Sequence, residues 1–367
     1  MLLEFSVRNF GPFKDVATMS LVPSTSDEHP ENALDSEASE QGVLGSAFVY
    51  GPNGSGRATL LDGLRAIKMI LGGNVSPASF ANPCVLGSGG PSEFSVMVAG
   101  RYFPYYYSVE VSDRGIESES LYQFATGRRS MVFVRSGNEF RFGKGAVKGH
   151  GTPSVESSFA YLPVAAELGD PACSETMAEI AKISFCDDSS PCDLVSDSEL
   201  YTIVLRALRI CDTGIVGFSD GVVTHECGGK TFSIPWEIES DSAKAILGII
   251  PAVCEALQLG KTVVIKNMWG LHPRVIRWIV EQFSSERNPN SAQLIVSMYD
   301  TSAMDLKNLL RRDQIYVLDR GSGGSSRLTR VTDIGGIRKD ADLQKAYFGW
   351  KLGGLPRISS SEQLLRR

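Results

Sequence analysis

The chain has 367 residues, with 36 Lys and Arg against 42 Asp and Glu, so its net charge is −6. Apolar residues make up 43% of the chain and charged residues 21%. These values exclude a disordered tail protein, a disulfide-stapled miniprotein and a histone-like basic binder. The length favours about two domains, or one large α/β body with a helical insertion.

No membrane span, secretory signal or metal site is expected from the sequence. The most apolar stretch, residues 245–257, is interrupted by Pro251 and Glu255, and it falls short of the length of a spanning helix. The N-terminal run MLLEFSVRNF contains Glu4 and Arg8, unlike a secretory signal, so a cytoplasmic protein is predicted. Seven cysteines without a CxxC pair and four scattered histidines predict buried thiols, with neither a disulfide framework nor a zinc site.

The N-terminal region of the chain predicts strands, one acidic loop and one strand–turn–helix unit. Residues 2–10 alternate as a strand, and residues 15–50 carry seven acids without Lys or Arg, which indicates a solvated acidic loop. Residues 45–71 predict a strand, a glycine-rich turn and a helix. Several short strands between 93 and 142 predict an antiparallel layer. The aromatic cluster at 102–107 could stack on nucleic-acid bases, but strand alternation favours packing on two faces of a sheet.

The C-terminal region predicts alternating helices and apolar strands. Residues 170–215 show helical patterns among acidic and Ser-rich loops, which indicates a separate helical lobe. Beyond it we expect helices and strands in alternation, at 244–259, 262–265, 273–283, 293–298, 303–311 and 314–318. Wholly apolar strands between helices indicate an α/β fold with a mostly parallel central sheet covered on both faces.

A phosphate loop is the strongest motif in the chain. GPNGSGRA at 51–58 nearly matches GxxxxGK[ST], and it lies after a predicted strand and before a predicted helix. Its glycines let backbone N–H groups turn toward one anion, and the helix N-terminus adds its dipole. A plain glycine-rich turn is the alternative. The residues expected to hold a nucleotide are Gly51, Asn53, Gly54, Ser55, Gly56, Arg57 and Thr59.

Two chemical positions of this loop are altered. Arg57 stands in place of the motif's lysine, and it is a longer, planar fork rather than a compact ammonium. Ala58 stands in place of the hydroxyl residue that holds Mg²⁺, and it offers no oxygen ligand. We therefore expect that a nucleotide can still bind but that metal-assisted hydrolysis suffers.

Several segments together resemble one protein family over nearly the whole chain. They are RNFGPFKD near the start, the loop GPNGSGRATLL, GIESESLY at 115–122, LHP at 271–273, NPNSAQLIVSMYD at 288–300, LLRRDQIYVL at 309–318 and RKDADLQKAYFGWKLGGLPRI at 338–358. They are similar to the ABC-type, SMC- and OLD-related AAA ATPases of bacterial abortive-infection and phage-defence loci, the AbiL/RloA-like group. The C-terminal segment is the most distinctive of them.

This resemblance implies one composite ABC-ATPase-like P-loop NTPase body. It combines an antiparallel β layer, a central mostly parallel sheet and an inserted helical lobe. The implied boundaries are 1–150 for the N-terminal ATPase half with the phosphate loop, 151–243 for the helical lobe, 244–358 for the C-terminal ATPase half, and 359–367 for a tail.

In this family two ATPase bodies sandwich ATP between the phosphate loop of one and a signature Ser-x-Gly helix of the other. The signature resembles residues 239–242, where Ser240 is kept for a contact in trans but Ser242 replaces the glycine. The Asp-Glu pair of Walker B corresponds to Lys266 and Asn267, or without a gap to Ile265 and Lys266. Either way, residues 261–280 contain no Asp or Glu.

The switch histidine that precedes Asp300 in the family pattern corresponds to Tyr299. Every element needed for phosphoryl transfer is thus altered, which predicts a pseudo-ATPase with no intact catalytic residue. The resemblance implies ATP or another nucleotide as cofactor, whereas the lost ligands argue against Mg²⁺. One hypothesis is that the Lys266 ammonium replaces the metal as a counter-charge; a lysine that merely reaches solvent at a strand end is equally compatible.

Three functions remain open from the sequence. The first is a non-hydrolysing subunit of an anti-phage or abortive-infection system, forming a homodimer, or a heterodimer with an ATPase-fold or effector subunit. The second is an active ATPase with non-standard motifs. The third is a DNA-binding SMC-like module, since residues 311–367 carry twelve Lys and Arg against six acids, although such a stretch is more often solvated or acid-paired. The chain ends soon after Pro356, so any nuclease activity is expected on a separate polypeptide.

Overall fold

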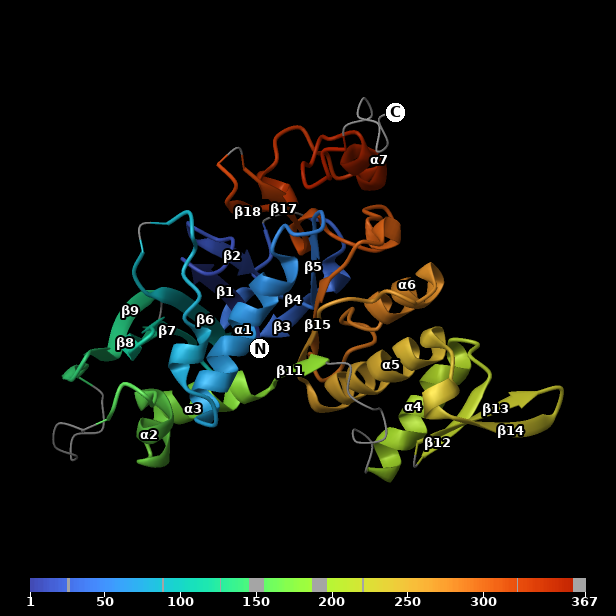
Figure 1. Ribbon diagram of the computed structural model, residues 1–367, viewed down its shortest axis with the longest axis horizontal. Coiled ribbons are helices and arrows are strands. Elements are labelled where there is room, and N and C mark those ends of the chain that lie inside the picture. The colour runs from blue at the N-terminus through green and yellow to red at the C-terminus, as the bar shows by residue number, and fades with distance from the viewer. Residues whose placement is uncertain are drawn as a thin grey trace, which may run out of the picture.

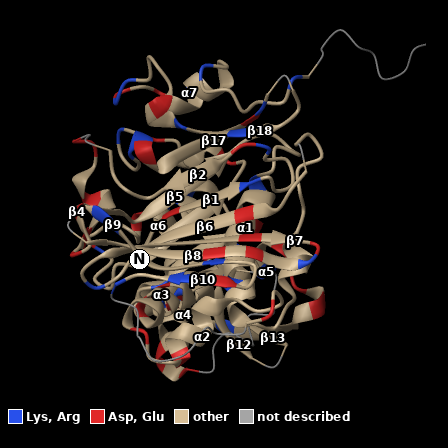
Figure 2. Ribbon diagram, turned by 90° about the vertical axis from the view of Figure 1, so that its left-hand side faces the viewer, with Lys and Arg blue, Asp and Glu red and all other residues tan. Residues whose placement is uncertain are grey.

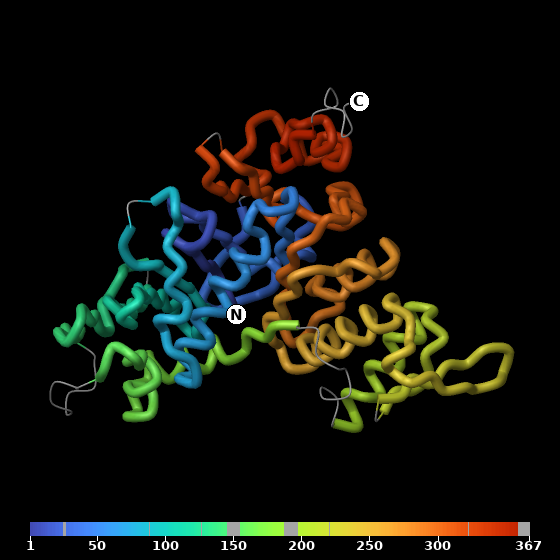
Figure 3. Tube along the Cα trace, in the orientation of Figure 1, coloured from blue at the N-terminus to red at the C-terminus, as the bar shows by residue number. Residues whose placement is uncertain are grey.

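The computed structural model describes residues 1–24, 27–87, 89–125, 127–144, 155–186, 197–219, 221–321 and 323–358. Its centre consists of two β-sheets with helix α1 (Arg57–Gly72) between them, and further helices lie on the outer side of the second sheet (Figure 1). The N-terminus lies near the centre of the molecule, and α7 (Leu343–Phe348) lies at its upper end (Figure 3).

The first sheet is the predicted antiparallel layer. Its seven strands run in the order β10-β9-β8-β7-β6-β1-β2. Tyr105 and Tyr107 are buried, whereas Tyr102 is exposed, so the aromatic cluster is divided as strand alternation predicts. The strands are β1 (Leu2–Arg8), β2 (Ala17–Ser20), β6 (Ser92–Ala99), β7 (Pro104–Ser112), β8 (Gly115–Ala125), β9 (Arg128–Ser136) and β10 (Glu139–Phe142).

The second sheet is the predicted mostly parallel one. Its strands run in the order β11-β15-β16-β5-β17-β18, and only the pairing of β17 with β18 is antiparallel. Ala47 and Val49 face the core shared with the first sheet, whereas Phe48 and Tyr50 face the second core. Helices therefore cover both faces, as expected for buried apolar strands. The strands are β5 (Ser46–Tyr50), β11 (Ile183–Cys186), β15 (Thr262–Ile265), β16 (Gln293–Ser297), β17 (Ile315–Arg320) and β18 (Ser326–Arg330).

Helices α5 (Asp241–Leu259) and α6 (Pro273–Glu281) cover the outer face of the second sheet. The Ser240 Oγ accepts a hydrogen bond from the Ala243 N–H at 3.2 Å and so begins α5, and Gly260 ends it in the left-handed region. By length and composition alone, α5 could cross a membrane, and among the described residues no other helix could. It packs against α4 (Ser198–Ile210), β11 and β15, so this single helix is weak evidence for a span.

The segment predicted as a helical lobe, residues 151–243, is more mixed than the sequence predicts. Its helices α2 (Tyr161–Glu167) and α3 (Pro171–Ala181) pack against α1, whereas α4 packs against α5. Strand β11 joins the second sheet, and a three-stranded sheet lies beside α4 (Figure 1). The helical lobe is thus divided into two groups of helices with strands between them. The three-stranded sheet consists of β12 (Ile215–Ser219), β13 (Val222–Cys227) and β14 (Lys230–Pro235).

Two other expectations are wrong. The acidic stretch at 15–50 contains β2 and the hairpin of β3 (Ala33–Ser36) and β4 (Ser39–Leu44) rather than one loop. The helix expected at 303–311 is replaced by turns, in which the Asp305 carboxylate accepts hydrogen bonds from the backbone N–H groups of Lys307 and Asn308. The described 3₁₀ turns are Pro30–Asn32, Pro77–Phe80, Trp236–Ile238, Thr301–Ala303, Arg312–Gln314 and Val331–Asp333.

The expectation of buried thiols is only partly met. Cys84, Cys173 and Cys254 are buried, but Cys227 is exposed at the end of β13. Cys192 lies outside the described residues.

Candidate functional site

The phosphate loop lies at the carboxyl end of β5, between β16 on one side and β17 on the other. The chain order of the strands reverses here, and such points of an α/β sheet are where ligands bind. Gly56 adopts φ = +93° immediately before Arg57, the first residue of α1. The local conformation is therefore strand, glycine turn and helix, as the motif predicts.

Neighbouring parts of the protein lie so close to the loop that two of its positions leave little room for a side chain. A Cβ on Gly56 would lie 2.5 Å from Cγ of Pro12, and one on Gly54 would lie 2.9 Å from Nη2 of Arg320. Arg320 donates a hydrogen bond to the Gly54 carbonyl at 2.5 Å, and the Ser326 hydroxyl donates to the Ser55 carbonyl at 2.7 Å. Sequence reasoning missed Arg320 and Ser326, because no motif marks either residue.

Arg57 is turned into the protein. Its side chain is buried, Nη1 donates to the Met298 carbonyl at 2.7 Å, and Cζ lies 3.5 Å from the centre of the Tyr299 ring. Burial lowers the pKa of the Arg57 guanidinium, and Tyr299 partly opposes this shift. The structure thus brings together two altered positions, Arg57 of the loop and Tyr299 of the switch, in one cation–π pair.

The loop keeps one feature that fits a phosphate anion. The Ser55 side chain is 1% exposed, and its Oγ has no hydrogen-bond partner among the described residues. A buried hydroxyl without a partner costs free energy that a bound anion would offset. The N-terminus of α1 and the glycine turn before it make the loop a fitting cradle for one phosphate group, with the Ser55 hydroxyl buried beside Gly51.

The residues around the loop do not fit a magnesium ion. Ala58 offers no oxygen, and Lys266 forms an ion pair with Asp62 of α1 at 2.6 Å. The Asn267 side-chain oxygen accepts a hydrogen bond from the Trp269 N–H at 3.0 Å. No group of three metal-ligating side chains occurs within the described residues.

The remaining predicted residues lie at the edges of this site. A Cβ on Gly11 would lie 2.7 Å from the Thr59 methyl carbon, so Thr59 packs on the Gly11 turn. Asn53 borders a separate hollow of about 390 Å³ beside Arg320. Asp300 accepts a hydrogen bond from the Ser302 N–H at 2.6 Å. Ser240 caps α5, and no described contact joins it to the phosphate loop of the same chain.

Four of the twelve Lys and Arg of the basic C-terminal stretch form ion pairs with acids among the described residues. Arg311 pairs with Asp313 at 2.8 Å, and Arg312 pairs with Glu28 at 2.6 Å. Lys339 lies 3.3 Å from Asp27. Figure 2 shows blue and red segments interspersed around β17, β18 and α7. This stretch is thus acid-paired in part, and DNA binding stays a prediction; Arg366 and Arg367 lie outside the described residues.

No protein-family model matches the chain, and no curated protein matches it. Among solved structures, the SMC head domain from Thermotoga maritima is 13% identical, with a TM-score of 0.47 over 90% of this chain and 98% of that one. An SMC head bound to the C-terminal winged-helix domain of ScpA is 13% identical, with a TM-score of 0.48 over 89% and 97%. An SMC head with an extended coiled coil, bound to the C-terminal domain of ScpA from Pyrococcus furiosus, is 11% identical, with a TM-score of 0.45 over 95% and 98%. At these identities the likeness concerns overall fold alone.

Proposed function

We propose that this chain is a non-hydrolysing subunit with a P-loop ATPase fold, a pseudo-ATPase that binds the phosphates of a nucleotide without using Mg²⁺. The observation that carries the proposal is the position of Arg57. Its guanidinium is occupied by the Met298 carbonyl and the Tyr299 ring, so it is not directed at a transferring phosphoryl group. An ATPase of this type depends on charge stabilisation of that group.

The ion pair between Lys266 and Asp62 supports the same conclusion. At the end of β15 the family places a carboxylate that holds the metal through water and another that orients the attacking water. Here a lysine occupies the position, and its charge is balanced by Asp62 at 2.6 Å. This pairing leaves Lys266 no need of a phosphate partner, so the hypothesis that its ammonium replaces Mg²⁺ is not supported.

We expect ATP to bind with the same affinity in the presence and absence of Mg²⁺. We also expect the protein to hydrolyse ATP no faster than buffer alone does. Calorimetric titration with ATP, with Mg²⁺ and with excess chelator, measures the first quantity. A phosphate-release assay measures the second. A lowered affinity in Ser55→Ala would identify the loop as the site, because this change removes only the unpartnered hydroxyl.

The double variant Arg57→Lys/Ala58→Ser serves as the matched comparison, because it restores the motif's ammonium and hydroxyl. It is expected to make ATP binding respond to Mg²⁺ while turnover stays absent, since both Walker B carboxylates are still missing. Hydrolysis by the unaltered chain that Arg57→Ala abolishes would overturn the proposal in favour of an active ATPase.

Within this proposal the chain acts as a structural or regulatory partner in a bacterial anti-phage or abortive-infection system. Its resemblance to that defence group over 338–358 supports the setting. The partner is a second copy or an ATPase-fold or effector subunit. Sedimentation of the purified chain with and without ATP tests the first of these, and co-purification with the product of a neighbouring gene tests the second.

A further inference from the structure

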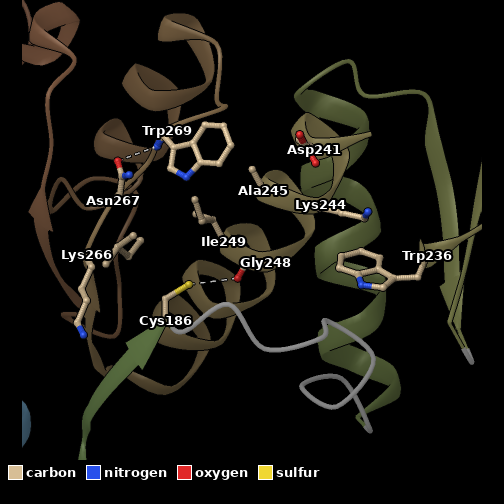
Figure 4. Close-up of a pocket in the computed structure, with 11 residues that line it drawn as sticks. Cys186, Trp236, Asp241, Lys244, Ala245, Gly248, Ile249, Lys266, Asn267 and Trp269 are labelled. Atoms are coloured by element: carbon tan, nitrogen blue, oxygen red, sulfur yellow. Dashed lines mark hydrogen bonds between the residues drawn. The ribbon is translucent and has the colours of Figure 1, made fainter. Parts of the chain in front are cut away.

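A second hollow lies at the same edge of the central sheet, away from the phosphate loop. It measures about 520 Å³ and is bordered by Cys186 and Ile265, the last residues of β11 and β15. The first turns of α5 form another side of it through Ala245, Gly248 and Ile249 (Figure 4). Its size falls within the range of small-molecule sites, and the carboxyl ends of parallel strands are where such sites occur.

Two tryptophans border the hollow on different sides. Trp236 comes from the turn before α5 and Trp269 from the loop after β15, and Figure 4 shows their rings on opposite sides of the space. Trp269 is 66% exposed, although its backbone N–H is held by Asn267 at 3.0 Å. An indole left facing an open space gains by stacking on a flat ligand. The walls therefore favour an aromatic ring.

Two lysines and one aspartate border the same space, and one of the lysines, Lys244, forms no ion pair with a described acid. Lys244 lies with Nζ 6.0 Å from the centre of the Trp236 ring and donates to the Glu237 carbonyl at 3.1 Å. An ammonium has three N–H donors, so two remain for a ligand. Asp241 contributes a carboxylate from the first turn of α5, and no ion pair joins it to Lys244 in the described chain. The charge of Lys266, the other lysine of the lining, is balanced by Asp62.

We propose that this hollow is a binding site for a small aromatic zwitterion, of the class of the aromatic amino acids. The ring lies in the space that Trp236 and Trp269 border, the ligand's carboxylate contacts Lys244, and its ammonium contacts Asp241. The hollow also borders Lys266 and Asn267, which the resemblance assigns to Walker B, but the assignment uses only Trp236, Asp241, Lys244 and Trp269 and so does not rest on the proposed function.

Gly248 provides a direct way to close the site. A Cβ built on this residue meets no atom within 4 Å, so a larger side chain extends into open space. Leucine is also a better helix former than glycine, and Gly248→Leu is therefore expected to fold. Gly248→Ala is the matched control, because a single methyl group leaves most of the hollow free.

The test is calorimetric titration of the full chain with L-tryptophan. We expect a Kd on the order of 1 mM or tighter, as suits a ligand of this size. Gly248→Leu should weaken binding at least about tenfold, the equivalent of 1.4 kcal/mol, while Gly248→Ala should retain it. Glycine, which has no ring, should not bind. An affinity for L-tryptophan that Gly248→Leu leaves unchanged, or no binding up to about 10 mM, would overturn the proposal.

Two analogues assign the charged contacts. Tryptamine lacks the carboxylate, so its affinity should not respond to Lys244→Met, whereas that of L-tryptophan should fall. Indole-3-propionate lacks the ammonium, so its affinity should not respond to Asp241→Asn. If both analogues respond equally to both variants, the ligand does not lie in the proposed orientation, and the assignment of a zwitterion fails.

Discussion

Replacing Glu119 by alanine is expected to lower the free energy of unfolding by about 3 to 5 kcal/mol, because it leaves Arg135 buried without a counter-charge. Each residue is only 1% exposed, and Nη1 of Arg135 lies 3.7 Å from Oε2 of Glu119. Arg135 also donates to the carbonyl groups of Val155 and Phe159 at 2.7 and 2.8 Å. Arg135 therefore helps to hold the loop that leads into α2.

Glu119 acts mainly as a hydrogen-bond acceptor. It accepts from the backbone N–H groups of Tyr161 and Leu162 at 2.7 and 2.9 Å, at the start of α2, and from the Tyr107 hydroxyl at 3.1 Å. Burial raises the pKa of the Glu119 carboxyl, although these hydrogen bonds and Arg135 oppose the shift. The charge itself is thus costly, and Glu119→Gln, which keeps one acceptor oxygen, should destabilise less than Glu119→Ala.

Urea unfolding followed by circular dichroism measures these differences. Glu139→Ala, at an exposed position in β10 of the same sheet, is the control and is expected to stay within about 0.5 kcal/mol of the unaltered chain. A loss of less than about 1 kcal/mol in Glu119→Ala would mean that the pair does not hold α2 to the sheet.

The regions of the fold that sequence predicts well are those in which neighbouring residues determine the structure. The apolar run at 262–265 is β15, and the glycine turn between β5 and α1 follows from the motif and its context. The helix predicted at 303–311 does not form, because tertiary packing determines the structure there. Its apolar spacing is helical, but Leu306, Leu309 and Leu310 are buried by turns packed on the second core, a tertiary effect that local spacing does not encode.

The conformation of the candidate site could not be predicted, because distant residues determine it. The loop motif places Arg57 where a lysine is usual, and the resemblance places Tyr299 where a histidine is expected, but neither predicts that the two side chains lie against each other. Arg57 contacts a carbonyl that lies 241 positions further along the chain. Packing of β5 beside β16 creates that proximity, and no local pattern encodes it.

The charge distribution illustrates the same point. The acidic stretch before the phosphate loop and the basic stretch near the C-terminus are both visible in the composition. The ion pair of Glu28 with Arg312, at 2.6 Å, joins them across the fold. Two such ion pairs, of Glu28 with Arg312 and of Asp27 with Lys339, join part of the acidic stretch to part of the basic one.

A comparable loss of stability is expected at the neighbouring pair of Arg311 and Asp313. Their side chains are 3% and 1% exposed, and the two oxygens of Asp313 lie 2.9 and 2.8 Å from Nε and Nη2 of Arg311. The backbone N–H and the hydroxyl of Ser24 also donate to Asp313, both at 2.7 Å. Asp313→Ala should therefore cost about 3 to 5 kcal/mol, since it removes the carboxylate that forms two hydrogen bonds with the buried Arg311 charge.

This pair also predicts how stability depends on pH. Burial raises the pKa of Asp313, but hydrogen bonds from Arg311 and Ser24 outweigh it, so the pKa is lowered overall. An unfolded Asp titrates near pH 3.9, at about its ordinary value. The stabilisation from Asp313 is therefore fully present above about pH 4 and is lost as the pH falls through the lower pKa of the folded state.

Urea unfolding between pH 7 and pH 3 tests this dependence. The unaltered chain should lose stability below about pH 4, whereas Asp313→Asn should start from a lower value and decline less steeply, because its side chain cannot be protonated. Asp340→Asn, which alters an exposed ion pair with Arg338, should leave both the value and the slope nearly unchanged. Equal slopes for the unaltered chain and Asp313→Asn would show that Asp313 does not hold its proton differently in the two states. The contacts of Arg311 would then stabilise the fold by hydrogen bonding alone, and the acid sensitivity would have to come from other carboxylates.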